Sequence, residues 1–567
     1  TVKGLTAINS LGYKIPDDFG VVGFDQGDNA EIYSPKLTYV YQPTELVAKQ
    51  SFEMLHKMIN EEEVSLSKTV ASKFVLGMSS GSSKNAKEDS VLLCGSAFDD
   101  IGGWTSDSQF MDVMGSSYLL AHGLGHPVKD ASTVFFVAKE GDYHIYVRTK
   151  NWTAFWTDKP TPGVFSLSID SKPVGGTFGT GSVEWHWQEG GTVHLARGNH
   201  RISVHDLTGF DGRFDSILLT LNHGAPVEDI STLRNKYLGI PSLPEDKGTF
   251  DFVVVGGGVA GMCAALSAAR LGHKVALVQD RKVLGGNNSS EVRVGLGGRI
   301  NIGPYPSLGY LLNEFAPSRK GNARPAEVYE DGKKLDIILK EKNITLFLGF
   351  KVTGVDKSDS GTICSVTATN TDNYRTIRIS GHYFADCTGD AALGVLAGAN
   401  CVMGRESFDE YGEPSAPLES DGITLGASVQ WYSEEEDEPT CFPDIDWGLP
   451  IDENTVQKVR RGQWYWEVGM MDDQIAEAEK IRDYGMYVAY SNWSYIKNHS
   501  SFRDEYAKSA MKWLSYYAGK RESRRILGEF VLREQDLRDF TIYEDGCVCT
   551  SWYIDNHEPD PGNAADD

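Results

Sequence analysis

The stretch Phe250-Asp251-Phe252-Val253-Val254-Val255-Gly256-Gly257-Gly258-Val259-Ala260-Gly261 decides how the larger half of this 567-residue chain folds. Its first half is an apolar run typical of a buried strand, and its second half is a glycine-rich turn. Met262 to Leu271 then forms an alanine-rich helical pattern, and Val275 to Val278 is a second apolar strand. A GxGxxG motif in this context is a strong signal, and it predicts a βαβ unit that binds a dinucleotide.

The three motif glycines have separate expected roles. Gly256 permits a tight turn, Gly258 lets the backbone approach a pyrophosphate, and Gly261 allows the helix to pack closely on the strand. The helix N-terminus would present its N–H groups to the anion. An acidic residue usually follows the second strand to bind the ribose hydroxyls, but this position holds Gln279, with Asp280 beside it. Either side chain can serve a diol, so both are candidates.

Two later segments go beyond a simple nicotinamide-binding domain. Gly285-Gly286-Asn287-Asn288-Ser289-Ser290-Glu291 is a second flexible loop that is rich in hydrogen-bond donors. Tyr383-Phe384-Ala385-Asp386-Cys387-Thr388-Gly389-Asp390 ends a predicted strand with an aspartate suited to a sugar-alcohol hydroxyl. Ala391 to Ala399 is predicted to be a helix.

Together the three segments resemble the FAD-dependent oxidoreductases of the two-dinucleotide-binding type, which are related in their flavin module to the flavin subunit of heterodisulfide reductase. The resemblance runs from about Asp251 to the end of the chain. Gly404-Arg405-Glu406-Ser407 and Gly519-Lys520-Arg521-Glu522-Ser523-Arg524-Arg525 agree with it. The family normally adds another glycine-rich segment over the flavin pyrimidine, and none follows Arg525, so we expect the domain to be truncated at its C-terminus.

The resemblance implies FAD as the cofactor and a set of residues that bind it. These are Gly256, Gly258 and Gly261 at the pyrophosphate, Gln279 or Asp280 at the adenosine ribose, Gly285, Gly286 and Asn287 on the ribityl–flavin side, Val352 at the adenine edge through its backbone, and Gly389 and Asp390 at the ribityl chain.

Candidate catalytic residues follow the second glycine loop. A flavin enzyme needs a donor near the reduced flavin and, for alcohol oxidation, a base near the substrate hydroxyl. Glu291, Arg293, Arg299 and Asn301 are candidates for these roles. Glu291 and Arg293 also stand two apart in a strand-like run, so a surface ion pair between them is an equally weighted alternative.

Two polar segments divide the chain into three predicted units. Residues 79–89 form a small, polar linker, and residues 223–248 carry three prolines and scattered charges. We therefore expect a fragment at 1–80, a domain at 90–222 and the oxidoreductase domain at 250–567. Short alternating runs such as Tyr143-His144-Ile145-Tyr146-Val147 predict an antiparallel β-sandwich in the middle unit, which resembles the sandwich that precedes the flavin domain in some of these proteins.

Tryptophans in the middle unit suggest carbohydrate binding, because exposed indoles stack on the apolar faces of sugar rings. They are Trp104, Trp152, Trp156, Trp185 and Trp187. The alternative is that they fill the core of the sandwich, and the alternation of Trp185 and Trp187 does not say which face is wet.

The first unit resembles the effector domain of lac repressor-type regulators. Ile15-Pro16-Asp17-Asp18-Phe19-Gly20-Val21-Val22-Gly23-Phe24-Asp25 and Pro35-Lys36-Leu37-Thr38-Tyr39-Val40-Tyr41-Gln42-Pro43 carry the resemblance, followed by an amphipathic helix from Glu45 to Asn60. It implies that Asp25 contacts an effector sugar; a plain turn residue is the alternative. About 80 residues of the pattern are present without a helix-turn-helix, so we interpret this unit as a remnant.

Composition excludes several classes of function. The formal charge is 54 − 79 = −25, which repels nucleic acid and anionic lipid. No apolar run approaches the ~18 residues of a membrane helix. Eight scattered cysteines without a CxxC motif favour buried free thiols in a reducing, cytoplasmic setting over a disulfide framework or a metal site.

The sequence thus predicts a multidomain chain: an α/β FAD/NAD(P)-binding (Rossmann-like) domain preceded by an antiparallel β-sandwich and a partial α/β periplasmic-binding-protein-like fragment. The leading hypothesis is an FAD-dependent oxidoreductase that acts on a small organic substrate, with a sugar derivative suggested by analogy and with no electron acceptor identified. The alternative is a carbohydrate-binding protein whose flavin domain is incomplete and inactive. A transcription regulator is disfavoured by the missing DNA-binding headpiece and the negative charge.

Overall fold

The computed structural model describes residues 86–87, 89–227, 229–303, 305–462, 466–546 and 552–559, and, before them, residues 4, 7–8, 10–13, 15, 19–24, 37–60, 70 and 72–75. Asp25, most of the 79–89 linker and Cys547 and Cys549 lie outside the described residues, as do the predictions made for them.

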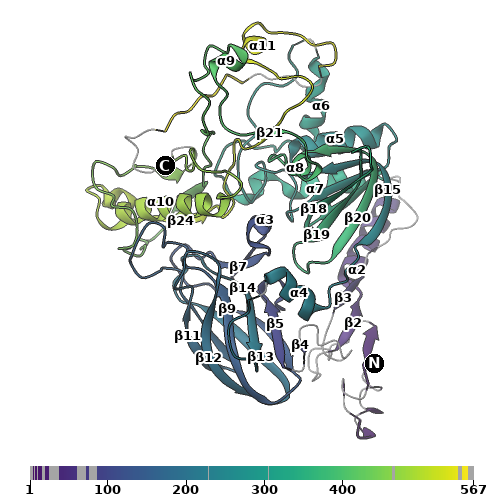
Figure 1. Cartoon of the computed structure of the whole chain (residues 1–567), viewed down its shortest axis with the longest axis vertical. Coiled ribbons are helices and arrows are strands. Elements are labelled where there is room, and N and C mark those ends of the chain that lie inside the picture. Colours follow the sequence, from purple (N-terminus) through teal and green to yellow (C-terminus); the bar gives the residue numbers. More distant parts are fainter. Residues whose placement is uncertain are drawn as a thin grey trace.

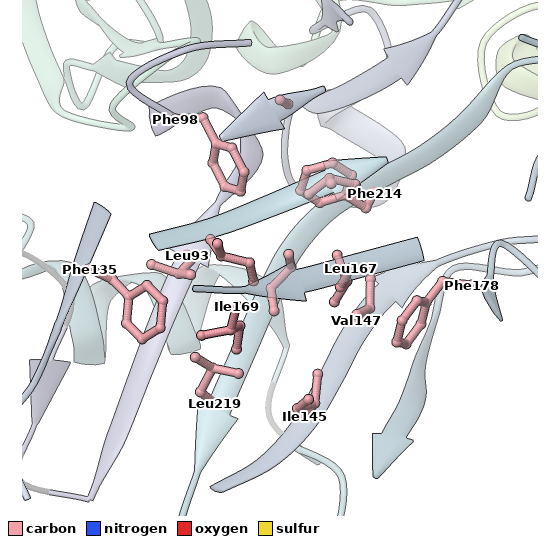
Figure 2. Packing of buried hydrophobic residues seen from close by; sticks show 14 of the residues in the cluster. Leu93, Phe98, Phe135, Ile145, Val147, Leu167, Ile169, Phe178, Phe214 and Leu219 are labelled. Atoms are coloured by element: carbon pink, nitrogen blue, oxygen red, sulfur yellow. The ribbon is translucent and has the colours of Figure 1, made fainter. Parts of the chain in front are cut away.

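The middle of the chain forms two antiparallel sheets with a common core, called here the two-sheet unit (Figure 1). Buried and half-buried residues alternate strictly along Ala131–Val137, as expected of a strand with one face in a core. One sheet has the order β11-β10-β13-β8, and the other has the order β12-β9-β14-β5-β4, with β7 also pairing β14 and β6 pairing β7. Figure 2 shows Phe135, Leu167 and Phe214 among the side chains that meet between them.

The strands of the first sheet are β8 (Ala131–Val137), β10 (Phe165–Ile169), β11 (Lys172–Phe178) and β13 (Gly198–Asp206). Those of the second are β4 (Ala86–Lys87), β5 (Ser90–Cys94), β6 (Thr105–Asp107), β7 (Tyr118–Ala121), β9 (Gly141–Thr149), β12 (His186–Leu195) and β14 (Gly212–Thr220), with the short helices η2 (Gly95–Ala97) and α3 (Met111–Met114) between them.

The tryptophans of the two-sheet unit are packed against other side chains and are buried or half-buried. Trp104 is 2% exposed in the core between the sheets, and Trp152 is 1% exposed with its indole N–H donating to the Phe210 carbonyl at 3.0 Å. Trp156, Trp185 and Trp187 are half-buried, each against a hydrophobic cluster. Core packing therefore describes these side chains, and the argument from exposed indoles to sugar binding does not hold for them.

The dinucleotide motif lies in a mixed sheet with the order β17-β16-β15-β20-β19-β18. The predicted strand–helix–strand is confirmed, although β15 already begins at Glu245. Val253 and Val255 face one hydrophobic cluster and Val254 faces another that includes helix α5, so the strand is buried on both sides as in a parallel sheet. The elements are β15 (Glu245–Val255), α5 (Val259–Arg270), β16 (Val275–Gln279), η3 (Pro306–Gly309), α6 (Tyr310–Phe315), η4 (Ala326–Tyr329), α7 (Asp331–Lys340), β17 (Ile344–Leu348), β18 (Phe350–Lys357), β19 (Ile363–Asn370), β20 (Thr376–Asp386) and α8 (Ala392–Ala397).

The polar segment 223–248, which was predicted to join two units, contains a helix that its composition did not indicate. α4 (Ile230–Leu238) is capped at its start by the Asp229 carboxylate, which accepts from the N–H groups of Ser231 and Thr232. Its Leu233 is 2% exposed and packs against the second sheet of the two-sheet unit. The segment is therefore part of a folded surface rather than an open linker.

The C-terminal part is built on the long helix α10 (Ala478–Asn498), which lies across the two-sheet unit in Figure 1. Trp152 and Phe210 of that unit share one cluster with Tyr487 and Tyr490 of α10. The remaining elements here are β21 (Cys401–Val402), α9 (Phe408–Tyr411), β22 (Trp431–Glu435), β23 (Arg461–Gly462), η5 (Arg503–Tyr506), β24 (Ser509–Leu514), β25 (Arg525–Ile526) and α11 (Glu534–Arg538).

The N-terminal fragment has a small sheet, β1-β2-β3, and the predicted amphipathic helix. Its elements are β1 (Val22–Phe24), β2 (Thr38–Tyr41), α2 (Thr44–Ile59) and β3 (Lys73–Val75). Phe52 and Ile59, on the apolar side of α2, are 69% and 71% exposed. The helix exists, but its apolar face has little cover.

Candidate dinucleotide-binding site

The first glycine loop connects β15 to α5, and its glycines differ in what surrounds them. A Cβ on Gly256, whose φ is 106°, would lie 2.2 Å from the Cys387 carbonyl oxygen, and one on Gly261 would lie 1.8 Å from the Gly256 oxygen. A Cβ on Gly258 would meet only the Gly286 Cα, at 3.9 Å. Gly256 and Gly261 are thus required by packing, whereas Gly258 borders open space at the N-terminus of α5.

The second loop is attached directly to the first. The Gly285 N–H donates to the Gly257 oxygen at 2.9 Å, and the Gly257 N–H donates to the Gln279 side-chain oxygen at 2.6 Å. The Gln279 amide also donates to the Val283 oxygen at 3.2 Å, and the residue is 3% exposed. Gln279 therefore connects the two loops, and its side-chain amide is engaged in doing so. Of the two candidates for binding the ribose, the half-buried Asp280 is the one whose side chain does not make these loop contacts.

The third segment reaches the same end of the sheet after β20. The Cys387 N–H donates to the Val255 oxygen at 2.7 Å, which places Gly389 and Asp390 beside the first loop. Gly389 has a φ of 83°, and a Cβ there would meet nothing within 4 Å. Three segments that are far apart in sequence, with 389 − 256 = 133 positions between Gly256 and Gly389, thus converge at one end of the sheet.

A fourth segment, residues 519–525, closes on this site, and the sequence analysis gave it no role. Lys520 donates to the Asp390 carboxylate at 2.7 Å, and Ser523 donates to its other oxygen at 2.8 Å. Asn287 of the second loop donates to the Lys520 carbonyl at 2.8 Å. The sequence signals for these residues were the agreement of Gly519 to Arg525 with the flavoprotein resemblance and the dense run of donors between Lys520 and Arg525.

Glu291 lies in a turn beside these loops and pairs with Arg281, not with Arg293. The Arg281 guanidinium is 3.3 Å from the Glu291 carboxylate, and both side chains are 14% exposed. Burial raises the pKa of Glu291 to about 7, although Arg281 pulls it downward. The strand-like interpretation of 291–293 and the proposed surface ion pair were therefore wrong, because the chain turns here and brings Arg281 to the carboxylate.

Arg293 packs against an aromatic ring and bonds to the backbone. Its guanidinium carbon lies 3.8 Å from the centroid of the Trp513 ring, and its Nε donates to the Ser290 oxygen at 2.8 Å. Arg299 and Asn301 are exposed in the loop that leads to η3. Of the four catalytic candidates, Glu291 is the one that the structure places in a charged pair against the glycine loops.

Val352 is 8% exposed in β18, where its backbone is in register with Ala368 of β19. Its predicted backbone contact with adenine stays a prediction.

The three segments fit FAD on their own geometry. Gly258 provides no side-chain cap for α5, which leaves the N–H groups of its first turn to an anion. A Cβ placed on Gly258 or Gly389 would point into open space and not into neighbouring protein atoms. A pyrophosphate at Gly258 and a hydroxylated chain near Asp390 match these two openings.

A cavity of about 310 Å³ adjoins the site through the 519–525 segment. Arg405, Thr424, Glu522, Arg525 and His557 are among its lining residues. The Thr424 hydroxyl is buried and has no hydrogen-bond partner among the described residues.

Within the described residues, no cluster of three or more His, Cys, Asp or Glu could hold a metal ion. None of the helices in the described ranges is long and apolar enough to cross a membrane. The described cysteines are free; Cys94 is buried, as expected, whereas Cys364 and Cys441 are exposed.

Residues 251–567 match the family model described as FAD dependent oxidoreductase, and residues 1–80 match the periplasmic binding protein-like domain. Among curated proteins, the HTH-type transcriptional repressor PurR of Vibrio vulnificus (strain CMCP6) is 39% identical over 59 residues, which are 10% of this chain and 18% of that protein. PurR of Photorhabdus laumondii is 38% identical over 60 residues, again 10% of this chain and 18% of that protein. The chain thus spans less than a fifth of the length of these relatives.

Two solved structures show a partial likeness. The Thermovibrio ammonificans THI4 structure is 21% identical with a TM-score of 0.22, and the match covers 30% of this chain and 76% of that one. The 3-ketosteroid-delta4-(5alpha)-dehydrogenase from Rhodococcus jostii RHA1 is 14% identical with a TM-score of 0.22, and the match covers 34% of this chain and 58% of that one.

Proposed function

Since the chain belongs to the FAD dependent oxidoreductase family and is an FAD-dependent oxidoreductase, we propose that it oxidises or reduces a small organic substrate beside Glu291, with a sugar derivative as the candidate substrate. The observation that carries the proposal is the convergence of the two glycine loops and the 383–390 segment next to the half-buried Arg281–Glu291 pair. FAD supplies the two-electron chemistry, and the protein supplies binding, orientation and proton transfer.

The chain offers separate groups for the parts of the cofactor. The N-terminus of α5 and the backbone at Gly258 would hold the pyrophosphate, Asp280 the ribose, and Asp390 the ribityl chain. Lys520 and Ser523 fix the Asp390 carboxylate by two hydrogen bonds, so this acceptor is held in one orientation. Asn287 connects the second loop to the same segment, which fixes the loop on the flavin side.

Glu291 is suited to proton transfer at neutral pH. Removing hydride from an alcohol requires that the hydroxyl proton go to a base, and the reverse reaction requires an acid. A carboxyl group whose pKa is about 7 can take either role near pH 7. Arg281 keeps the ionised form of Glu291 accessible, because its positive charge offsets the burial of the carboxylate.

The candidate substrate class rests on the adjoining cavity. Arg405 is paired with the Asp421 carboxylate at 2.6 Å, and Arg525 is paired with Glu406 at 2.8 Å. Charges that are paired in this way give little selection for an anion, while carboxylates that line the cavity, such as those of Glu406 and Glu522, can accept hydrogen bonds from neutral hydroxyl groups. A neutral, polyhydroxylated molecule therefore suits the cavity better than a phosphate or a carboxylic acid.

The test is spectroscopic. The protein is incubated with excess FAD, freed of unbound flavin and examined in the blue absorption band; it is then mixed anaerobically with neutral polyols, aldoses, hydroxy acids and sugar phosphates. We expect stoichiometric flavin and bleaching by the neutral hydroxylated compounds. A protein that stays colourless would favour the carbohydrate-binding alternative, and bleaching by anionic compounds alone would reject the assigned substrate class.

A further inference from the structure

The two-sheet unit touches the flavin site through residues 514–519, which leave β24 and run beside Glu291. The Tyr516 carbonyl accepts a hydrogen bond from Gln109 Nε2 at 2.7 Å and another from Arg482 at 2.8 Å. Gln109 follows strand β6 of the two-sheet unit, and Arg482 belongs to α10. The segment is thus held by a side chain from a unit that lies outside the dinucleotide fold.

Gln109 is itself held in one orientation. The Asp107 carboxylate accepts from the Gln109 backbone N–H and from its side-chain Nε2, both at 3.0 Å. Its second oxygen accepts from Arg482 at 2.9 Å, and both Asp107 and Arg482 have no exposed surface. Because Asp107 takes one N–H of the Gln109 amide, the other is directed at the Tyr516 carbonyl.

The same segment also contacts both residues of the Arg281–Glu291 pair. The centroid of the Tyr517 ring lies 5.1 Å from the Arg281 guanidinium carbon, and the Tyr516 and Tyr517 rings are 5.0 Å apart. The Ser515 hydroxyl donates to the Glu291 carbonyl at 2.9 Å. If the Tyr516 carbonyl were no longer held, the neighbouring Ser515 and Tyr517 would therefore shift relative to Glu291.

We propose that Gln109 is a positioning residue of the flavin site: by holding the Tyr516 carbonyl, it keeps the Tyr517 ring closed over the Arg281–Glu291 pair and excludes water from Glu291. The two-sheet unit is then part of the catalytic environment rather than a separate binding module. The inference rests on the proposed function only in giving Glu291 its role in proton transfer.

Several charges surround Glu291, and their effects oppose one another. Burial is the largest influence on its pKa, and it acts upward. The groups that act on this carboxyl or respond to it are Arg281, which lowers its pKa, Asp280, Asp331 and Asp107, which raise it, and the phenols of Tyr516 and Tyr517. Since burial dominates, water entering at Tyr517 should lower the pKa of Glu291 toward its ordinary value.

The experiment measures this protonation directly in the protein without FAD. Infrared difference spectra across pH 4 to 9 follow the protonated carboxyl band that is present in the parent and absent in Glu291→Gln. Gln109→Met keeps the length of the side chain but removes both amide donors. We expect its midpoint to fall from about 7 by about one pH unit or more.

The matched control is Gln188→Met, which removes a glutamine of the same unit whose amide donates to the Thr177 oxygen at 2.9 Å on β11, away from residues 514–519. Its midpoint should equal that of the parent. Tyr517→Ala is the second variant, used if Gln109→Met does not fold, and should lower the midpoint in the same direction. A midpoint that stays at the parent value in the folded variant, or that moves equally in Gln188→Met, would overturn the proposal. A failure to bind FAD would instead reject the proposed function without affecting this titration.

Discussion

Gly258 is the residue at which cofactor binding can be separated from folding. Its missing Cβ has open space in front of it, so Gly258→Asp should leave the apoprotein folded. A carboxylate at this position adds both bulk and negative charge where the pyrophosphate would lie. We expect Gly258→Asp to lose FAD binding in equilibrium dialysis, with an unchanged melting temperature.

The matched control is Gly332→Asp in α7, where a Cβ would meet nothing within 4 Å. This variant should bind FAD like the parent. Gly261→Ala is expected to differ from both, because its Cβ would collide with backbone and destabilise the fold itself. Stoichiometric flavin in Gly258→Asp would show that the first loop is not the pyrophosphate site.

Asp390 provides a smaller, graded test. Its carboxylate is already held by Lys520 and Ser523, so Asp390→Ala removes one oriented acceptor and leaves those two donors to water. The loss in FAD binding should be on the order of 1 to 3 kcal/mol, or roughly 5- to 150-fold in Kd. Fluorescence titration with FAD measures it, and an unchanged Kd would remove Asp390 from the site.

Glu291 also makes stability depend on pH. Its pKa is raised from 4.5 to about 7 in the folded protein, so between these values the folded state binds more protons than the unfolded state. Stability contributed by this group is therefore present at low pH and lost as pH rises through about 7. Relative to the parent, Glu291→Gln should gain free energy of unfolding as pH rises from 5 to 8, and the gain should be on the order of 2 to 3 kcal/mol at pH 8. Its melting temperature should therefore exceed that of the parent by a margin that grows with pH. Parallel melting curves of the two proteins across this range would contradict the assignment.

At the scale of elements, helix α10 is joined to the two-sheet unit by buried charges. Arg213 of β14 donates to both oxygens of Asp483, at 3.0 and 2.9 Å, and to Glu479 at 3.0 Å. Arg213 has no exposed surface, and Asp483 is 1% exposed. Removing one partner would leave a buried charge uncompensated.

Arg213→Met should accordingly cost about 3 to 5 kcal/mol in urea unfolding. The comparison is Lys458→Met, which breaks the exposed ion pair of Lys458 and Glu505 and should cost less than about 1 kcal/mol. Equal losses in the two variants would mean that the buried network does not hold α10 in place.

The same helix shows why the sequence predicted some elements and not others. The βαβ unit has apolar strands, glycine punctuation and a short helix, and each of these patterns is local. In α10, residues 481–494 are all buried, including the charged Arg482 and Asp483 and the polar Asn492, so this stretch has no separate polar face. A helix whose polar residues are satisfied by another unit carries no 3.6-residue hydrophobic period to recognise.

The candidate site divides along the same line. The glycine loops could be predicted because backbone conformation selects glycine locally, and Asp390 because it closely follows the end of a strand, β20. Lys520, Ser523 and Gln109 could not, because each acts through a contact with a segment far away in sequence. Glu291 was identified by its place after the loop, but its partner was mistaken because the turn at 290–292 is not visible in the residue pattern.

At the scale of the whole molecule, the N-terminal fragment should be dispensable for FAD binding. The apolar face of α2 is largely exposed, with Phe52 at 69% and Leu55 at 54%. Strand β4 pairs with β5 of the two-sheet unit, so a chain that begins at Asn85 keeps that edge. We expect this shorter chain to bind FAD with the same Kd and to melt more sharply, and the fragment to be the first part cleaved by dilute protease. Loss of flavin on deletion would assign the fragment a working contact with the oxidoreductase.

The buried pairing of Arg213 with Asp483 has a consequence for how the chain is made. The two residues are 270 positions apart, and synthesis at about 5 to 20 residues per second separates them by roughly 14 to 54 s. During that interval the two-sheet unit has left the ribosome, but Asp483 and Arg482, the α10 partners of Arg213 and Asp107, have not yet been translated. Water must solvate these charges until α10 is made, so docking of α10 on the two-sheet unit requires that this water be expelled from the surface around Arg213 and Asp107.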